Sequence, residues 1–298
     1  MKQSLCNICL AVATLLAPSV WGWPSGWPVT NTVHHWELYD GKHDLRTVVA
    51  LSLLRSPRDY RLPRPDDTLL LYAKNNGIPV HGMVTEAKNV AEEGLAMLSS
   101  GNITNRDEKS ELTRYCRKLL TFMSHTKDPS ALPYLELKST SADRDIRETA
   151  SRGVVNVLGI EAISFLRKIE RDGTHTPREF YSLYETFGRR VRMEKKNNPK
   201  AKLDDAHQFL LESVEKEKAG DTVKMIDQVL CETLEGYSAS VQREKVADRM
   251  VKAGPEYSRP HFEAVKAEIE KTPTAKRKDF TAKGELLDPE PKNEKPDL

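Results

Sequence analysis

The sequence has no excess of charge of either sign. Its 298 residues include 46 lysines and arginines and 44 aspartates and glutamates, which leaves a net charge of only +2. A dedicated nucleic-acid-binding protein usually carries a large basic excess. The near balance therefore argues against nucleic acid as a partner. Two short basic stretches, 188–196 and 275–278, have acids nearby and are typical of solvated surfaces.

Long hydrophobic runs are scarce, and the one long run lies at the N-terminus. A lysine precedes an apolar run over residues 5–17, and Pro18, Ser19 and Gly22 follow it. This order is typical of a secretory signal peptide that is cleaved near Gly22. A membrane anchor is the alternative, but the run is shorter than the ~20 apolar residues that a spanning helix needs. We expect residues 1–22 to be a signal peptide, and the mature chain to be periplasmic or secreted without a membrane span.

Cysteine is also rare, with four residues in the whole chain. Cys6 and Cys9 lie in the predicted signal peptide, so only Cys116 and Cys231 remain after cleavage. Two thiols are too few for a disulfide framework. Both lie in helical apolar patterns, which favours buried free thiols. A single disulfide between them is the alternative in an oxidising compartment.

The common motifs of catalysis and nucleotide binding are missing. The sequence has no GxSxG elbow, no GxxxxGK[ST] loop and no GxGxxG loop, and neither Cys116 nor Cys231 has the context of a protease nucleophile. A carboxylate pair for glycoside hydrolysis would be distant in sequence, so the 44 acids single out no pair. We therefore expect no cofactor and no catalytic residue.

Alternation of apolar and polar residues is almost absent, which predicts very little sheet. From Asp44 onward, apolar residues recur instead at helical spacing. The clearest helix start is a capping box, with Thr176 as the cap, Pro177 in the first turn and Glu179 three residues after the cap. Glycines that suit helix ends follow several of these segments: Gly77, Gly101, Gly159 and Gly173.

These patterns divide the chain into four segments. After the signal peptide, residues 23–43 form an irregular leader rich in tryptophan, proline and histidine. Residues 44–271 form an all-α domain. Residues 272–298 contain many charges and prolines and little to bury, which predicts a disordered tail.

The middle of the helical domain repeats itself. The phrase ALPYL begins at Ala131 and AISFL begins at Ala162, an offset of 31 residues, and Arg-Glu recurs at the same offset at 147 and 178. A helix pair of this length cannot bury its apolar face alone, but it can when it stacks on a copy of itself. The repeat therefore predicts stacked helix pairs.

These residues resemble the HEAT-repeat family. Its motif has a short apolar helix, a turn with aspartate, and a second helix that opens with an aliphatic residue, arginine and, after two positions, alanine. Ile146, Arg147 and Ala150 stand in these places, and the match is best over residues 131–173. The next unit departs from the motif, because proline and tyrosine occupy the aliphatic and alanine positions, so the register beyond residue 192 stays open.

The resemblance implies a fold and a mode of action. The fold would be an irregular α-α superhelix of stacked helix pairs, with an irregular helical bundle as the alternative. Members of the family are mostly scaffolds that present a long curved surface to a partner. For this chain we expect a core between layers formed by Leu132, Leu135, Ile146, Ala150, Val154, Leu158, Ile163, Leu166 and Ile169.

The leader holds candidates for binding. All four tryptophans lie between residues 21 and 36, and Trp23 and Trp27 each precede a proline. They would suit an aromatic platform for a glycan or a proline-rich partner. The alternative is a lid over the apolar end of the first helical layer.

His34, His35, His43 and Asp44 are candidate metal ligands in the same region. Adjacent histidines project in different directions, and no HExxH or CxxC frame accompanies them. The leading hypothesis is therefore an exported, non-enzymatic scaffold that binds a protein partner. The alternative is an exported all-α metal-dependent hydrolase, or a glycan-binding protein, that uses residues 23–44.

Overall fold

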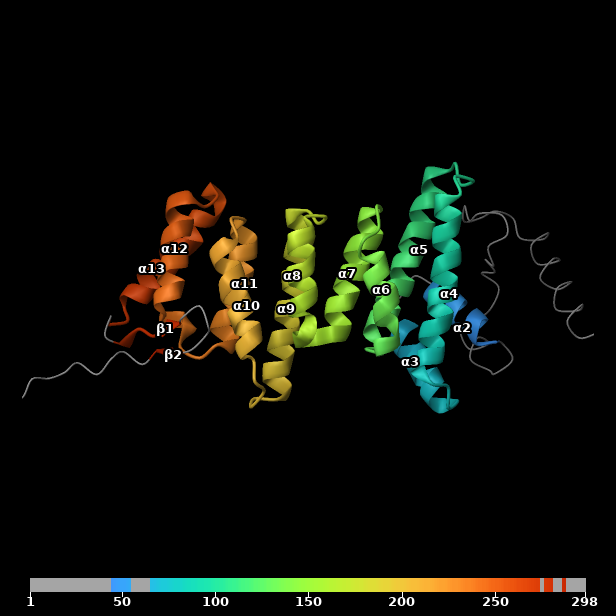
Figure 1. The fold of residues 1–298 in the computed structure, drawn as a ribbon, viewed down its shortest axis with the longest axis horizontal. Coiled ribbons are helices and arrows are strands. Elements are labelled where there is room, and N and C mark those ends of the chain that lie inside the picture. The colour runs from blue at the N-terminus through green and yellow to red at the C-terminus, as the bar shows by residue number, and fades with distance from the viewer. Residues whose placement is uncertain (1–43, 55–64, 274–275, 281–285, 288–298) are drawn as a thin grey trace, which may run out of the picture. The chain divides into compact units, whose positions relative to one another are not determined.

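The computed structural model describes residues 44–54, 65–273, 276–280 and 286–287. This part of the chain is all-α with essentially no sheet, as the sequence predicts (Figure 1). Its only strands are β1 (Asp279–Phe280) and β2 (Leu286–Leu287), which pair in antiparallel fashion. In the described ranges, no helix combines the length and the apolar composition that crossing a membrane requires. The chain divides into two compact units, Met1–Val157 and Leu158–Leu298, where the sequence indicates one helical domain.

The described residues of the first unit are mostly helical. The elements are α2 (Leu45–Leu54), α3 (Pro65–Asn75), α4 (Val80–Ser99), α5 (Arg106–His125), the 3-10 turn η2 (Pro129–Ala131), α6 (Leu132–Lys138) and α7 (Arg144–Leu158).

Two close contacts show how these helices pack. Tyr115 of α5 is buried and donates a hydrogen bond to the backbone oxygen of Ala50 in α2 over 2.8 Å. Gly153 of α7 lies against α5 and α6, since a Cβ there would be 3.1 Å from Leu135 Cδ2 and 3.4 Å from Ser124 Cβ. These contacts place α5 beside α2, and α7 beside α5 and α6, with buried residues between them. No strand lies between residues 130 and 190, all of which the structure describes.

The second unit contains the remaining elements. They are η3 (Gly159–Ala162), α8 (Ile163–Asp172), α9 (Pro177–Asn197), α10 (Asp204–Lys216), α11 (Gly220–Thr233), η4 (Tyr237–Ala239), α12 (Val241–Ala253), η5 (Glu256–Ser258), α13 (Arg259–Glu270) and the two short strands.

An aromatic cluster joins α9 to α10 in the core of the second unit. The ring of Phe209 lies 5.5 Å from Phe187 in an edge-to-face arrangement and 6.0 Å from Tyr184. Such pairs contribute about 0.5–1.5 kcal/mol beyond the area they bury. All three side chains are buried, so the cluster fixes α9 against α10.

Local start and stop signals act as the sequence predicts. Thr176 Oγ1 accepts from the backbone N–H of Glu179, and the Glu179 carboxylate accepts from the backbone N–H of Thr176, which completes the capping box. Gly77, Gly101 and Gly173 have φ angles of 63°, 73° and 62°, in the left-handed region that favours glycine.

The predicted core is largely confirmed. Six of the nine expected residues are buried: Leu135, Ile146, Ala150, Val154, Leu166 and Ile169. Leu132, Leu158 and Ile163 are only half-buried. Cys116 is buried, Cys231 is half-buried, and both thiols are free, which agrees with the first of the two interpretations of these cysteines.

Ordered structure extends past residue 271, where the sequence analysis places the start of a disordered tail. The backbone N–H of Phe280 donates to Gln242 Oε1 over 2.9 Å, and the Gln242 amide donates back to the Phe280 carbonyl. Phe280 is 3% exposed, and Lys278 O accepts from Val241 N over 3.1 Å. The prediction fails for residues 276–280 because a glutamine side chain of α12 supplies the backbone partners of an extended segment. Arg277, expected to be solvated, has a buried side chain that pairs with Glu244.

Candidate binding groove

An open groove of about 990 Å³ lies in the second unit. Most of its lining comes from α9 and from α11, and single side chains from α12, η5 and α13 complete it. Pockets for small molecules usually measure about 300–1,000 Å³. The groove is therefore at the upper end of that range and is large enough for a segment of a polypeptide.

Two glycines allow the elements around the groove to approach closely. A Cβ at Gly188 of α9 would lie 2.6 Å from Val229 Cγ2 of α11, and a Cβ at Gly220 would lie 2.5 Å from Ser258 Cβ in η5. Cβ contacts of this length are not tolerated without movement of the neighbouring atoms. The absence of a side chain at these positions therefore sets the spacing of α9, α11 and η5.

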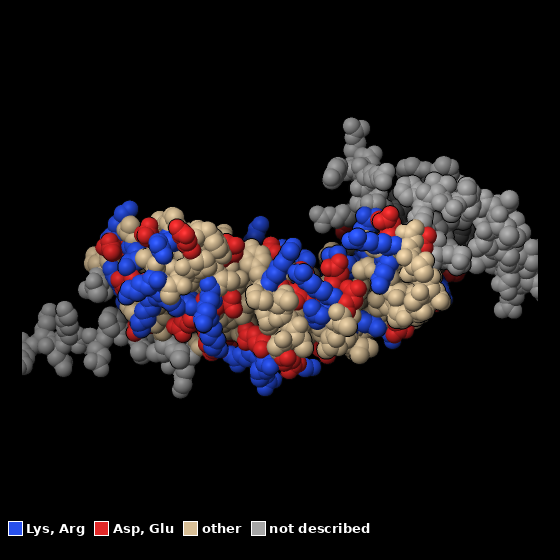
Figure 2. Space-filling view, turned by 90° about the horizontal axis from the view of Figure 1, so that it is seen from above, with Lys and Arg blue, Asp and Glu red and all other residues tan. Residues whose placement is uncertain are grey.

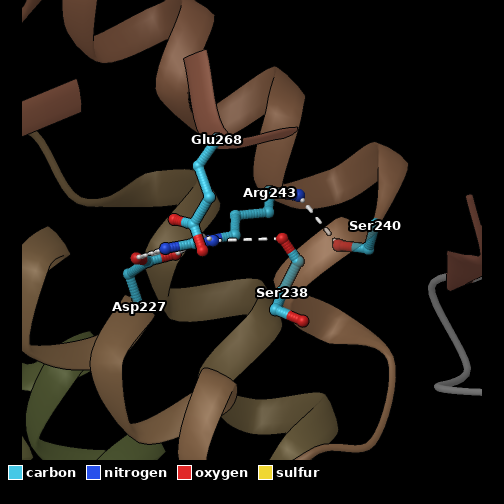
Figure 3. A network of polar contacts seen from close by, with 5 residues as sticks. All are labelled: Asp227, Ser238, Ser240, Arg243 and Glu268. Carbon is cyan, nitrogen blue, oxygen red and sulfur yellow. Dashed lines mark hydrogen bonds and ion pairs between the residues drawn. The ribbon is translucent and has the colours of Figure 1, made fainter. Parts of the chain in front are cut away.

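Two of the residues that line the groove, Asp227 and Arg243, form a buried ion pair. Figure 3 shows this pair and the residues around it. Arg243 Nε donates to Asp227 Oδ1 over 3.1 Å, and Arg243 Nη2 donates to Asp227 Oδ2 over 3.2 Å. The two side chains are 9% and 4% exposed. Arg243 Nη1 also donates to the Ser238 carbonyl over 3.0 Å and to Glu268 Oε2 over 3.3 Å. One guanidinium thus connects α11, η4 and α13.

The partners of Arg243 compensate for the burial of its positive charge. Burial alone would lower the pKa of Arg243, but the hydrogen bonds and the charge of Asp227 outweigh it and raise the pKa. Removal of one partner from a buried pair typically costs about 3–5 kcal/mol, because the other charge stays buried without compensation. Arg243 and Asp227 therefore hold each other in place by charge, and breaking the pair is costly.

The groove contains one thiol, which is poorly suited to nucleophilic chemistry. Burial, followed by the charge of Asp227, raises the pKa of Cys231 to about 12. A thiol attacks as its thiolate, so Cys231 is almost entirely protonated near neutral pH. Burial and the same carboxylate raise the pKa of Tyr237 well above its usual value. The polar groups near Asp227 therefore form a structural network rather than an activated site.

Among the other charged residues that line the groove, some form ion pairs and some do not. Glu185 pairs with Arg189 over 3.2 Å, and Arg192 pairs with Glu232 over 3.4 Å. Arg178 and Lys224 also line the groove, and no carboxylate in the described ranges lies within ion-pair distance of either one.

An exposed aromatic ring stands at the edge of the groove. Tyr257 is 61% exposed, and Lys224 Nζ lies 5.8 Å from the centroid of its ring. Such cation–π contacts contribute about 0.5–1 kcal/mol at exposed sites. His261 lies nearby, and burial followed by the charge of Lys224 lowers its pKa. The imidazole of His261 is therefore neutral at neutral pH. The ammonium group of Lys224 and the ring of Tyr257 lie together at this part of the groove.

The structure tests few of the residues that the sequence singles out. Trp23, Trp27, His34, His35 and His43 are outside the described residues, so the glycan and metal hypotheses for the leader stay predictions.

Asp44 is the exception, and its carboxylate is engaged at the start of α2. It accepts from Thr47 N and from Thr47 Oγ1, both over 2.9 Å. Partial burial alone would raise the pKa of Asp44, but these hydrogen bonds outweigh it and the pKa is lowered. Asp44 therefore acts as a helix cap. No group of three metal-ligating side chains occurs among the residues that the structure describes.

No local pattern in the sequence indicates the groove. Arg178, Lys224, Arg243 and Tyr257 come from four different elements and share no motif. The basic stretch 188–196 was the nearest hint, and it agrees with its interpretation as a solvated surface, because Arg189 and Arg192 form exposed or half-exposed ion pairs.

Lysines and arginines alternate with aspartates and glutamates over the face of the molecule that Figure 2 shows.

No protein-family model matches the chain, and neither the curated proteins nor the solved structures contain a match.

Proposed function

We propose that this chain is an exported helical-repeat scaffold that binds a protein partner, and that the groove of the second unit is its principal contact site. Catalysis is not part of the proposal. Residues 1–22 would direct export, and the mature chain would act in a periplasm or outside the cell.

One observation carries the binding proposal. The groove combines a large exposed aromatic ring, Tyr257, with the buried ion pair of Arg243 and Asp227. Aromatic residues and arginine are enriched in protein interfaces, and the residues that dominate binding lie in well-packed surroundings. Tyr257 offers a ring that is 61% exposed, and Lys224 Nζ lies 5.8 Å from its centroid. These features favour recognition of another protein.

The packing of the helices supports the scaffold part of the proposal. Gly153 in the first unit and Gly188 in the second each allow a helix to lie directly against its neighbours. Stacked helix pairs of the HEAT type bury their apolar faces in this way, layer by layer. We therefore propose a HEAT-like arrangement for this chain, with the stacked-helix surface as the part that meets the partner.

A matched pair of variants tests the groove as the contact site. Tyr257 is 61% exposed and Leu137 of α6 is 62% exposed, so neither side chain supports folding and both offer a large apolar surface. The full mature chain, Tyr257→Ala and Leu137→Ala would each be immobilised and exposed to extract from the native source. Quantitative mass spectrometry would then identify the proteins that each retains.

The proposal predicts a protein that is retained equally by the wild type and by Leu137→Ala, and several-fold less by Tyr257→Ala. Equal retention by all three baits would show that the groove is not the contact site. The mass of the mature chain from its native host tests export separately, because cleavage near Gly22 removes a segment of known mass.

A further inference from the structure

The unpaired charges of the groove indicate what kind of segment it accepts. Among its charged lining residues, Asp227 is neutralised by Arg243, Glu185 by Arg189, and Arg192 by Glu232. The charges left over are those of Arg178 and Lys224, with Asp221 as the opposing one. Arg243 is shared by Asp227 and Glu268, so the lining residues and their partners carry no net positive charge. What distinguishes the groove is that Arg178 and Lys224 are cations without a carboxylate partner in the described ranges.

Arg178 lies in the first turn of α9, where a positive charge does not stabilise the helix. It is the second residue of α9, directly after Pro177 and two residues after the Thr176 cap. The helix dipole is positive at this end, so a cation here is unfavourable and an anion is favourable. The acidic residue of this turn, Glu179, is buried in the capping box. Arg178 itself is exposed and faces the groove without a carboxylate partner in the described ranges.

The positive end of the α11 dipole compensates part of the negative charge of Asp221, so this carboxylate offsets less of the charge of Arg178 and Lys224. Asp221 is the second residue of α11, at the positive end of that helix, where a carboxylate is locally stabilised. Lys224 lies one turn further along α11 and extends over the ring of Tyr257. The two unpaired cations thus come from separate helices that line the groove, and aromatic and apolar surface from Tyr181, Met225 and Tyr257 accompanies them.

We propose that the groove binds an acidic segment of a partner protein, in which carboxylates flank an apolar side chain. The carboxylates pair with Arg178 and Lys224, and the apolar side chain packs against Tyr257. This inference rests on the proposed function, because it names the chemistry of the partner segment for the same groove.

Fluorescence anisotropy with the full mature chain tests the inference directly. The probes are three labelled peptides of equal length that repeat Glu-Glu-Leu, Gln-Gln-Leu or Lys-Lys-Leu. The Glu peptide is expected to bind most tightly, with an affinity that falls as salt is raised, because screening weakens exposed charge pairs. Arg178→Glu and Lys224→Glu are each expected to weaken it about fivefold, the scale of an exposed ion pair.

Lys168→Glu is the matched control. Lys168 is an exposed lysine of α8 in the same unit and does not line the groove, so this reversal makes the same change in net charge. It should leave the affinity for the Glu peptide unchanged. Equal affinity for the Gln or Lys peptide, equal weakening by Lys168→Glu, or no saturable binding of the Glu peptide would each overturn the inference.

The same variants separate this inference from the proposed function. If Tyr257→Ala abolishes retention of a partner while Arg178→Glu and Lys224→Glu do not affect it, the groove is the contact site but its ligand is not acidic. If Tyr257→Ala has no effect on retention, the proposed function fails whatever the peptides do.

Discussion

Arg243 of α12 holds the carboxylate of Asp227 in α11 through two nitrogens, and both side chains are almost fully buried. The residues on either side of Arg243 in the sequence contact the C-terminal segment instead. Gln242 accepts from the backbone N–H of Phe280, and Glu244 accepts from Arg277. Three consecutive residues therefore tie α11, α13 and the C-terminal segment to the start of α12.

Loss of the Asp227 charge should destabilise the second unit strongly. Asp227→Asn keeps the size of the side chain but leaves the buried guanidinium of Arg243 with only the exposed carboxylate of Glu268 as a counter-ion. We expect the free energy of unfolding to fall by about 3 kcal/mol or more, measured by urea denaturation. Glu185→Gln removes a carboxylate from an exposed pair in the same unit and should cost at most about 1 kcal/mol. Equal effects of the two variants would contradict the structural role of the buried pair.

Gly188→Ala should force α9 and α11 apart. The added methyl group would lie 2.6 Å from Val229 Cγ2, so overpacking is expected to cost about 1–3 kcal/mol of unfolding free energy. Gly82→Ala in α4 is the control, because there the nearest side-chain atom, Leu45 Cδ2, is 3.8 Å from the new Cβ. Alanine is the better helix former, so this variant should be neutral or more stable by up to about 1 kcal/mol. A stabilising Gly188→Ala would show that the two helices are not in close contact.

Ile146→Asp tests the packing of helices in the first unit. Ile146 is 1% exposed in α7, so the substitution places an unpaired charge among apolar side chains. We expect a loss of at least about 3 kcal/mol, seen as a cooperative loss of helical circular dichroism at lower temperature. Leu137→Asp, at a position that is 62% exposed, should change stability by about 0.5 kcal/mol or less. Unchanged melting of Ile146→Asp would count against the layered packing.

Features of the fold that depend on residues close together in the sequence could be predicted from it. The capping box of Thr176 and Glu179 and the left-handed glycines at 77, 101 and 173 depend on residues within one turn, and the sequence displays them directly. Six of nine core residues also follow from periodicity, because the buried face of a helix repeats every 3.6 residues.

Features that depend on distant residues were not visible. Gln242 binds the backbone of Phe280, which lies 38 residues away, so composition alone indicated a disordered tail there. The groove is likewise assembled from α9, α11 and η5, and its spacing depends on which glycines meet which side chains. Charge counts along the chain could not separate Arg178, which lacks a partner among the described residues, from Arg192, which pairs with Glu232.

The second unit should lose stability in mild acid because of His207. This histidine of α10 is 7% exposed, and its Nε2 lies 3.0 Å from Thr233 Oγ1. Burial, which outweighs the nearby charge of Asp204, lowers the pKa of His207 to about 4, whereas an unfolded histidine titrates near pH 6.5. The unfolded state therefore takes up a proton at a higher pH than the folded state does. The contribution of His207 to stability is complete above pH ~6.5 and is lost as the pH falls toward about 4.

Urea unfolding at pH 7 and at pH 5 measures this effect. Between these values the wild type should lose about 2 kcal/mol through His207, since one pH unit on a shifted group corresponds to about 1.4 kcal/mol. His207→Gln removes the titrating group and keeps a side chain that can reach Thr233, so its loss over the same interval should be smaller by that amount. His261 is more exposed, and partial burial lowers its pKa as well, so His261→Gln should reduce the loss by less than His207→Gln does. If His207→Gln shows the same loss as the wild type, His207 is not the group whose protonation unfolds the unit.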